Sequence, residues 1–482
     1  MQNRINSIIK SVCLACIIVF SFSSAAKAEK SVVSAKPNIV LIFIDDMGWK
    51  DAGFMGSDLY RTPNIDHLAK EGMVFTQAYA GAGNCAPSRA CLISGQYTPR
   101  HGVYAVNSTD RGPKNLMRLV PIPNRKDLAT GNVTIAEAMK AAGYATGMFG
   151  KWHLGYNDET FPAAQGFDVA DHFSSSNNKN FNNDNDPKHI YRIAKEACQF
   201  IEDHKARPFF VYISHHATHM GIQARQEMYD KFEKLSGGKQ HTHKKFAAMN
   251  CQMDDGVGIV LAKLKELGLD DNTLVVFTSD NGALPESSPA PLRGHKGMYY
   301  EGGIRVPMIV CWPGIVKPGT TCDVPVINVD LYPTFLAAAG GGVPTGKVLD
   351  GADISLLFES KPFSERSIFW HFPGYLDKDT GGSRSPDFRT RPVSVIRKGD
   401  WKLHLYHEEW ILDGGRDKID TNNSVELYNL KDDISERNNL ANVNTAKRDE
   451  LLSDLLAWFT HTNALLPSET NPNYAAPAKK KK

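Results

Sequence analysis

The sequence predicts an α/β fold: a large, mostly parallel β-sheet sandwiched by helices, followed by a smaller C-terminal α+β domain. Two observations predict the sheet. Short apolar segments rich in β-branched and aromatic residues have the composition of buried strands, and helical patterns alternate with them. Parallel strands need crossover connections, usually helices, and burial on both faces makes such strands continuously apolar. We therefore expect helices on both faces of the sheet.

The elements follow in chain order. Strands are predicted at 39–44, 145–149, 209–213, 274–278 and 308–311. Helices are predicted at 133–142, 188–204 and 244–267. After residue 371 the chain changes character, with short strands expected at 393–397, 401–407 and 425–430, a polar loop at 374–391 and a last helix at 445–460. This change predicts a large domain over 29–370, a smaller one over 371–465, and a polar, basic tail over 466–482 that is disordered from residue 475 on.

The N-terminus has the pattern of an export signal. Arg4 and Lys10 precede an apolar run at 12–22, and the small-residue site AKA at 26–28 follows. We expect a signal peptide over 1–28, cleaved after Ala28, and an exported protein, periplasmic or secreted. The apolar run is too short for a membrane span. Because Cys13 and Cys16 lie inside the run, a lipoprotein anchor is the less favoured alternative, and no stable membrane anchor is expected.

Charge and cysteine content exclude several classes of protein. The formal net charge is +2, which argues against nucleic acid as a partner. Beyond the predicted signal peptide the cysteines are too few for a disulfide scaffold in a chain of this length, and none forms a C-x-x-C zinc pair.

The most unusual segment is CAPSR at 85–89. Pro87 fits the first turn of a helix, where its missing N–H costs nothing. Cys85 then lies at the helix N-terminus, which favours anions, and Arg89 projects from about the same face one turn later. A reactive group and a fixed cation would converge there. The alternative is a disulfide or buried cysteine beside a surface arginine.

Acidic, amide, lysine and histidine side chains follow four of the predicted strands. Ligands of open α/β sheets bind at the carboxyl ends of the strands, so these side chains are expected to share one rim. Each cluster alone could be a turn. The residues are Asp45 and Asp46, Lys151 and His153, His215, His216 and His219, and Asp280 and Asn281.

The rim predicts a metal site and an anionic substrate. Oxygen donors alone favour a hard cation such as Ca²⁺ or Mg²⁺, and clustered carboxylates would repel one another without it. Cationic and proton-carrying groups surround these acids, which suits an oxyanion ester whose transition-state charge must be neutralised. They are Arg89, Lys151, His153, His219 and Lys296.

At these residues the chain resembles the type I, formylglycine-dependent sulfatases of the alkaline phosphatase superfamily. The matching segments are CAPSR at 85–89 with Gly95, GKWHLG at 150–155, DD at 45–46, DNG at 280–282, and KG at 296–297 followed by YEGGIRVP at 300–307. The resemblance implies an alkaline phosphatase-like fold, a sulfuric ester hydrolase, and conversion of Cys85 to Cα-formylglycine by a formylglycine-generating or anaerobic sulfatase-maturating enzyme. It also implies one Ca²⁺ held by Asp45, Asp46, the modified Cys85, Asp280 and Asn281.

The resemblance also implies a mechanism. The hydrated aldehyde at position 85 attacks sulfur and forms a covalent sulfoenzyme. Arg89, Lys151 and Lys296 hold the sulfate, His219 protonates the leaving alcohol, and His153 takes a proton from the second hydroxyl so that sulfate leaves. One departure concerns His219: the family often has Pro-His-x-Pro there, and this chain has THMG at 218–221. His215 and His216 therefore stay open as rivals.

The expected substrate is a sulfated polysaccharide or oligosaccharide, such as an algal galactan, ulvan or a glycosaminoglycan. Trp370 and Phe372 are candidates to stack on a sugar, and Arg384, Arg389 and Arg391 to pair with its anionic groups. Ordinary packing is the alternative for all five. Two other functions stay open: a phosphonate monoester or phosphodiester hydrolase of the same superfamily, and a non-catalytic protein that binds sulfated glycans.

Overall fold

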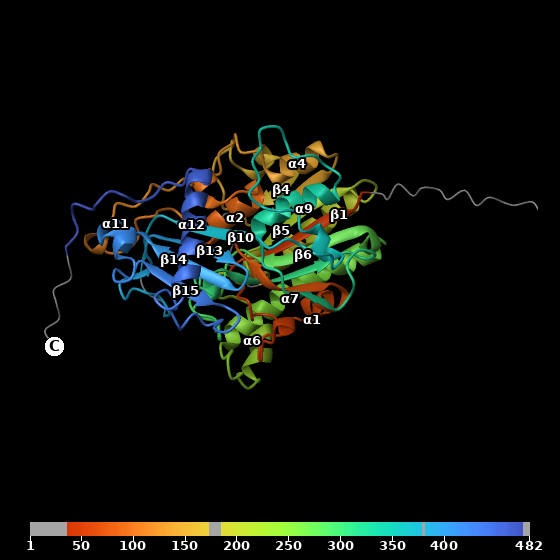
Figure 1. The fold of residues 1–482 in the computed structure, drawn as a ribbon. Coiled ribbons are helices and arrows are strands. Elements are labelled where there is room, and N and C mark those ends of the chain that lie inside the picture. The colour runs from red at the N-terminus through yellow and green to blue at the C-terminus, as the bar shows by residue number, and fades with distance from the viewer. Residues whose placement is uncertain (1–35, 173–184, 378–380, 476–482) are drawn as a thin grey trace, which may run out of the picture. The chain divides into compact units, whose positions relative to one another are not determined.

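The fold was analysed in a computed structural model, which describes residues 36–172, 185–377 and 381–475. The predicted signal peptide, with Cys13 and Cys16, and the last seven residues of the tail lie outside these ranges. Within them the chain forms a large sheet, a smaller antiparallel sheet and the helices that pack on both (Figure 1). No helix of the described part of the chain is long and apolar enough to cross a membrane.

The large sheet has the order β4-β3-β5-β1-β6-β7-β2-β8, with β9 paired to β2. Strands β4, β3, β5, β1 and β6 are parallel to one another, whereas β7 is antiparallel to both β6 and β2. Their bounds are β1 Asn38–Ile44, β2 Met73–Tyr79, β3 Ala145–Gly150, β4 Val169–His172, β5 Phe209–His215, β6 Thr273–Ser279, β7 Arg305–Cys311, β8 Thr320–Cys322 and β9 Val326–Ile327. The mostly parallel sheet predicted from the sequence is confirmed.

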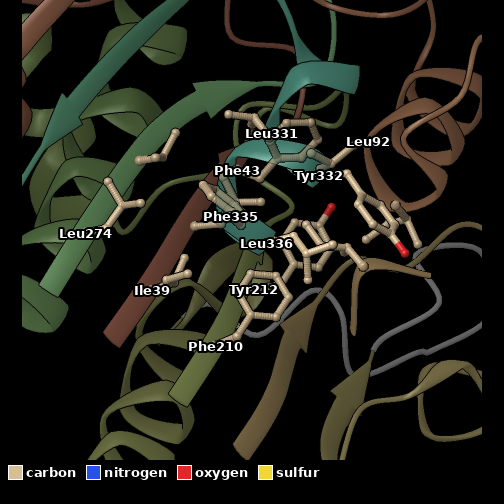
Figure 2. Packing of buried hydrophobic residues seen from close by; sticks show 14 of the residues in the cluster. Ile39, Phe43, Leu92, Phe210, Tyr212, Leu274, Leu331, Tyr332, Phe335 and Leu336 are labelled. Atoms are coloured by element: carbon tan, nitrogen blue, oxygen red, sulfur yellow. The ribbon is translucent and has the colours of Figure 1, made fainter. Parts of the chain in front are cut away.

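Helices cover both faces, as the continuously apolar strands predict. Along β1, Ile39, Leu41 and Phe43 point into one core and the alternate residues into the other. The first core, shown in Figure 2, packs against α2 Cys85–Ser94, α4 Ile135–Ala141 and α9 Leu331–Ala338. The second packs against α1 Pro63–Glu71, α5 Ile190–Asp203 and α7 Lys244–Glu266, with α6 Gln226–Glu233 beside α7.

The smaller sheet is antiparallel, in the order β10-β13-β14-β15, and α12 Thr445–Thr462 packs against it. Its strands are β10 Ser367–Phe372, β13 Val393–Lys398, β14 Trp401–Tyr406 and β15 Val425–Asn429; β11 Leu376–Asp377 and β12 Phe388–Thr390 pair separately. Shorter helices are α3 Thr98–His101, α8 Glu301–Ile304, α10 Ser355–Phe358 and α11 His407–Leu412. The first part of the tail is paired, because Val120 N–H donates to the Glu469 carbonyl.

Two helix starts differ from expectation for local reasons. The helix expected from residue 133 begins at Ile135, because Thr134 caps it and forms a capping box with Glu137. The helix expected from residue 188 begins at Ile190. Lys188 and His189 have φ of 61° and 53°, which no right-handed helix contains.

Candidate active site

The carboxyl ends of four parallel strands bring the candidate residues together. β1 runs into Asp45 and Asp46, β3 into Lys151, β5 into the segment 216–219, and β6 into Asp280 and Asn281. Asp46 adopts a left-handed backbone, φ 66°, and its N–H donates to Asp280 Oδ1 at 3.0 Å. This bond joins the ends of two neighbouring strands, so the rim inferred from the sequence exists.

Helix α2 begins at Cys85, which is 1% exposed and lies against this rim. Burial raises the pKa of the five other thiols in the described chain. For Cys85 the pKa is held well below its usual value, because Lys151 and Lys296 outweigh the opposing effect of burial. The neighbouring His153 side chain also lowers the pKa of this thiol. All six of these cysteines are free, and position 85 is the one surrounded by positive charge.

Arg89 is buried more deeply than a side chain that contacts substrate directly would be. Its guanidinium is fully buried and bonds Asp280 Oδ2 through Nε at 3.0 Å and Nη2 at 2.7 Å. Nη1 donates to the Tyr212 hydroxyl at 3.1 Å and to Ser214 Oγ. Arg89 is therefore committed to fixing Asp280 against β5.

Three buried carboxylates share a small volume. Oxygens of Asp45, Asp46 and Asp280 all lie within 4.8 Å of one another. Burial and the nearby Asp45 raise the pKa of Asp280 well above its usual value. Burial acts in the same direction on Asp45, but Lys151, His219 and Arg89 together hold its pKa well below the usual range.

Two lysines neutralise this cluster. Lys151 Nζ lies 2.6 Å from Asp45 Oδ2, and Lys296 Nζ lies 2.6 Å from Asp46 Oδ1. Although burial opposes it, Asp45 raises the pKa of Lys151 and Asp46 raises that of Lys296. Both ammonium groups are therefore positively charged, and both act on the nearby Cys85.

The donor set fits a hard divalent cation. Asp45 Oδ1 and Asn281 Oδ1 are buried, yet neither accepts a hydrogen bond within the described residues. Asn281 Nδ2 donates to Asp46 Oδ1 at 2.8 Å, which orients the amide oxygen away from that carboxylate. Buried unsatisfied oxygens beside carboxylates are the donors that Ca²⁺ and Mg²⁺ require. Asp45, Asp46, Asp280 and Asn281 would hold such an ion.

Of the three histidines at the end of β5 and just beyond it, His219 is the one placed at the site. Its Nε2 lies 3.7 Å from Asp46 Oδ2, and its side chain is 34% exposed. Ligand atoms of Asp45, Cys85 and His219 also lie within 4.8 Å of one another. His215 and His216 are buried, and burial lowers the pKa of both, that of His215 to about 4. Access to solvent therefore favours His219.

His153 is a second histidine near the thiol. It follows β3 with φ 64°, and burial and Lys151 lower its pKa. A largely neutral imidazole beside position 85 is suited to accept a proton.

The aromatic residues suggested as a sugar platform are core residues instead. Trp370 and Phe372 are at most 1% exposed, and Trp370 Nε1 donates to the Ala80 carbonyl. His371, which lies between them in the sequence, is also buried, with Nδ1 bonded to Ser394 Oγ. These residues form β10, whose side chains pack between the sheets, and the packing alternative is correct.

The three arginines of the 374–391 loop differ in their surroundings. Arg384 and Arg391 form ion pairs with Glu409, and Arg391 also pairs with Glu408. Arg389 Nη1 lies 3.4 Å from the Lys296 carbonyl, so Arg389 is beside the site.

Sequence reasoning missed Lys188, which lay inside a predicted helix. It is 2% exposed, and its Nζ donates to the Met220 carbonyl at 2.8 Å, next to His219. Burial lowers its pKa to about 8, although Asp45 acts in the opposite direction. Its left-handed backbone places it there, and no sequence pattern signals that conformation.

The site combines acids suited to a divalent cation with buried lysines, a cysteine of lowered pKa and two histidines. This combination is typical of a class of proteins, the metal-dependent hydrolases of anionic esters. Comparison with known proteins identifies the family. The sulfatase family model matches residues 37–341, and the model of the C-terminal region of N-sulphoglucosamine sulphohydrolase matches residues 294–461. The chain therefore belongs to the sulfatase family of the alkaline phosphatase superfamily and is a sulfuric ester hydrolase.

Individual relatives agree with this assignment. A sulfatase of Formosa agariphila is 32% identical over 91% of this chain and 92% of its own length. The N-acetylgalactosamine-6-sulfatase of Mus musculus is 32% identical over 77% of this chain and 72% of its own. Among solved structures, Ps i-CgsB is 29% identical and has a TM-score of 0.73 over 90% of this chain and 95% of its own.

Proposed function

We propose that the protein removes sulfate esters from sulfated carbohydrates by means of a formylglycine made from Cys85. The observation that carries this proposal is the position of Cys85 at the start of α2, between two ammonium groups and a histidine. Once converted, this residue would supply a hydrated aldehyde, with one hydroxyl to attack sulfur and a second whose deprotonation releases the sulfate.

A Ca²⁺ ion held by Asp45, Asp46, Asp280 and Asn281, together with the modified residue 85, would draw electron density from the sulfate oxygens and neutralise the carboxylates. The unsatisfied oxygens of Asp45 and Asn281 support this assignment. All of these donors are oxygens, which favours Ca²⁺ or Mg²⁺ over zinc.

The other catalytic steps are assigned to side chains of the protein. Lys151 and Lys296 compensate the negative charge of the sulfate in the transition state. Arg89 acts through Asp280, which it binds with two nitrogens. His219 donates a proton to the leaving alcohol, since it has the exposure that a departing sugar requires. His153 accepts the proton whose removal frees the sulfate.

A sulfated carbohydrate is proposed as substrate because named relatives act on or bind such molecules. One is an N-acetylgalactosamine-6-sulfatase, and Ps i-CgsB has been solved with a neocarrahexaose. A formylglycine-generating or anaerobic sulfatase-maturating enzyme is the proposed maturation partner. Export through the signal peptide at 1–28 would bring the protein to extracellular polysaccharides.

The test is the mass of the peptide that contains Cys85, measured after expression in a host with a maturating enzyme. Formylglycine formation lowers it by about 18 Da relative to unmodified cysteine. Cys85→Ala is expected to abolish turnover of 4-nitrophenyl sulfate, whereas Cys91→Ala, on the same helix, is the matched control and retains it. An unmodified Cys85 throughout would contradict the proposal and favour a glycan-binding role. Faster hydrolysis of an aryl phosphodiester than of the sulfate would indicate the phosphodiesterase alternative.

A further inference from the structure

A cavity lies at the opposite end of α2 from Cys85. Its volume is about 840 Å³, within the range of ligand-binding pockets. It is lined by the segment that follows α2, by residues around 123–133 and 345–348, and by the end of α12. Because α2 spans Cys85–Ser94, the cavity is about 15 Å from position 85 along the helix axis. It is therefore separate from the active site.

The cavity is lined by positive charge. Arg100, Arg125 and Lys347 line it, and none of the described lining residues is Asp or Glu. Arg100 is paired with Asp350 at 2.7 Å. Neither Arg125 nor Lys347 has a carboxylate oxygen within 4.0 Å in the described chain. Two cations without an ion-pair partner thus line one cavity, which favours an anionic ligand.

A buried hydroxyl in the lining also lacks a partner. Tyr104 is 2% exposed, and its hydroxyl forms no hydrogen bond within the described residues. A buried donor left unpaired costs free energy, which an oxygen of a bound molecule would recover. This hydroxyl belongs to a residue that lines the same cavity, and the observation is independent of the charge argument.

Lys347 is held in place for such contacts. Its Nζ donates to Asn132 Oδ1 and lies 5.5 Å from the centre of the Tyr332 ring. Burial lowers its pKa to about 8, although Glu137 and Asp350 act in the opposite direction. The side-chain amides of Asn132 and Gln96 bond each other at 2.9 Å, and both line the cavity, where sugar hydroxyls find donors and acceptors.

We propose that this cavity is a second, non-catalytic binding site for a sulfated oligosaccharide. Arg125 and Lys347 would contact sulfate groups, and the Tyr104 hydroxyl an oxygen of the sugar. The cations and the hydroxyl point to an anionic carbohydrate, and the choice of sulfate as the anion rests on the proposed function. Such a site would hold one stretch of a polymer while another stretch occupies the active site. It would thereby raise the effective concentration of the polymer at the active site.

The test measures binding of dextran sulfate, with unsulfated dextran of the same length for comparison, to the full chain by calorimetry. Arg125→Gln/Lys347→Gln is expected to weaken dextran sulfate binding about tenfold, and Tyr104→Phe about fivefold. The control Lys205→Gln/Lys317→Gln removes the same charge from exposed positions and should change binding less than about twofold. Turnover of 4-nitrophenyl sulfate should be unchanged in all three variants.

Hydrogen exchange locates the ligand independently. Dextran sulfate is expected to protect amides in 96–104 and 345–348. Equal affinity of the cavity variants and the charge-matched control, or no protection of these segments, would overturn the proposal. Tyr104→Phe keeps the ring, so it separates loss of binding from loss of folding. A wild-type chain without sulfatase activity would contradict the proposed function but leave this binding comparison intact.

Discussion

At the residue scale, the active site is a problem of charge compensation. The carboxylates of Asp45, Asp46 and Asp280 lie within 4.8 Å of one another in a buried volume, and Lys151, Lys296 and Arg89 lie against them. Yet one oxygen of Asp45 and the amide oxygen of Asn281 remain without hydrogen-bond partners in the described chain. Buried unpaired acceptors are costly, so these atoms mark where a cation belongs.

Removal of the metal is the first prediction. Chelation followed by gel filtration is expected to lower turnover of 4-nitrophenyl sulfate by at least about a hundredfold, and Ca²⁺ to restore it. Asn281→Ala should raise the free Ca²⁺ needed for half-maximal activity, whereas Asn272→Ala, at an exposed position, should leave it unchanged. Full activity with less metal than protein would contradict the metal assignment.

The second prediction distinguishes the histidines after β5. If His219 protonates the leaving alcohol, His219→Gln should slow release of sulfate from a sugar by about a hundredfold, but from 4-nitrophenyl sulfate by less than about tenfold, since nitrophenolate needs little protonation. His216→Gln serves as the comparison, because His216 is buried and should alter stability without this dependence on the leaving group. Equal losses on both substrates would argue against His219 as the acid.

The third prediction concerns stability and pH. Burial lowers the pKa of His215 to about 4, below its unfolded value of about 6.5. Its contribution to stability is therefore complete above pH 6.5 and is lost as pH falls from 6.5 towards 4. Between pH 7.5 and pH 5 the free energy of unfolding should fall by about 2 kcal/mol less in His215→Leu than in wild type. Urea unfolding at both pH values measures this, with His67→Asn, exposed, as the control.

At the scale of elements, the end of β3 depends on a glycine. Gly150 has φ 105°, and a Cβ there would lie 2.0 Å from the Ser214 carbonyl oxygen of β5. That same oxygen accepts a hydrogen bond from Lys151 N–H at 2.8 Å. The close approach of β3 to β5 therefore aims Lys151 at Asp45, and a side chain at position 150 is incompatible with it.

The fourth prediction tests this approach. Gly150→Ala should lower both the free energy of unfolding and the turnover of 4-nitrophenyl sulfate, because β3 must shift and move Lys151. Gly143→Ala is matched, since Gly143 has φ 89° but no atom within 4 Å of the added Cβ. In Gly143→Ala the free energy of unfolding should fall only by the strain of an alanine in a left-handed backbone, about 1–2 kcal/mol. The activity of this variant should be unchanged. Equal activity in the two variants would refute the role of the close approach.

At the scale of the whole molecule, a buried ion network joins the two sheets. Lys402 of β14 lies 2.9 Å from both Glu301 of α8 and Glu436, and all three side chains are fully buried. Glu301 also accepts a hydrogen bond from Tyr79 of β2. Burial raises the pKa of Glu436 to about 7, against the opposing effect of Lys402. The segment that contains Lys296 ends at α8, so this network anchors one side of the active site to the smaller sheet.

The fifth prediction follows from that network. Lys402→Met removes the cation that Glu301 and Glu436 share, and Arg305 still pairs with Glu301. The change should cost about 3–5 kcal/mol of unfolding free energy. Lys398→Met removes a lysine from β13 whose ion pairs with Glu450 and Asp454 are partly exposed, and should cost less than about 1 kcal/mol. Urea denaturation measures both. Similar losses in the two variants would show that the buried network does not join the sheets.

Particular residues show which parts of the fold and site could be predicted from the sequence. The five predicted strands of the large sheet formed because continuous apolar runs specify strands buried on both faces. Strand β2 was missed because Thr76 and Gln77 interrupt its apolar pattern, and the register shifts between Phe75 and Ala78. Trp370 was misjudged because an aromatic residue looks the same whether it packs in a core or faces a sugar.

The sequence by itself determined the chemistry: which acids, lysines and histidines follow the strands, and that a cysteine begins α2. It could do so because strand and helix patterns are local, and parallel strands necessarily bring their carboxyl ends to one rim. Tertiary structure alone decided that Arg89 is bound to Asp280, that His219 faces Cys85, and that a cationic cavity lies beyond α2. Burial and pairing depend on residues far apart in the chain, so no local pattern encodes them.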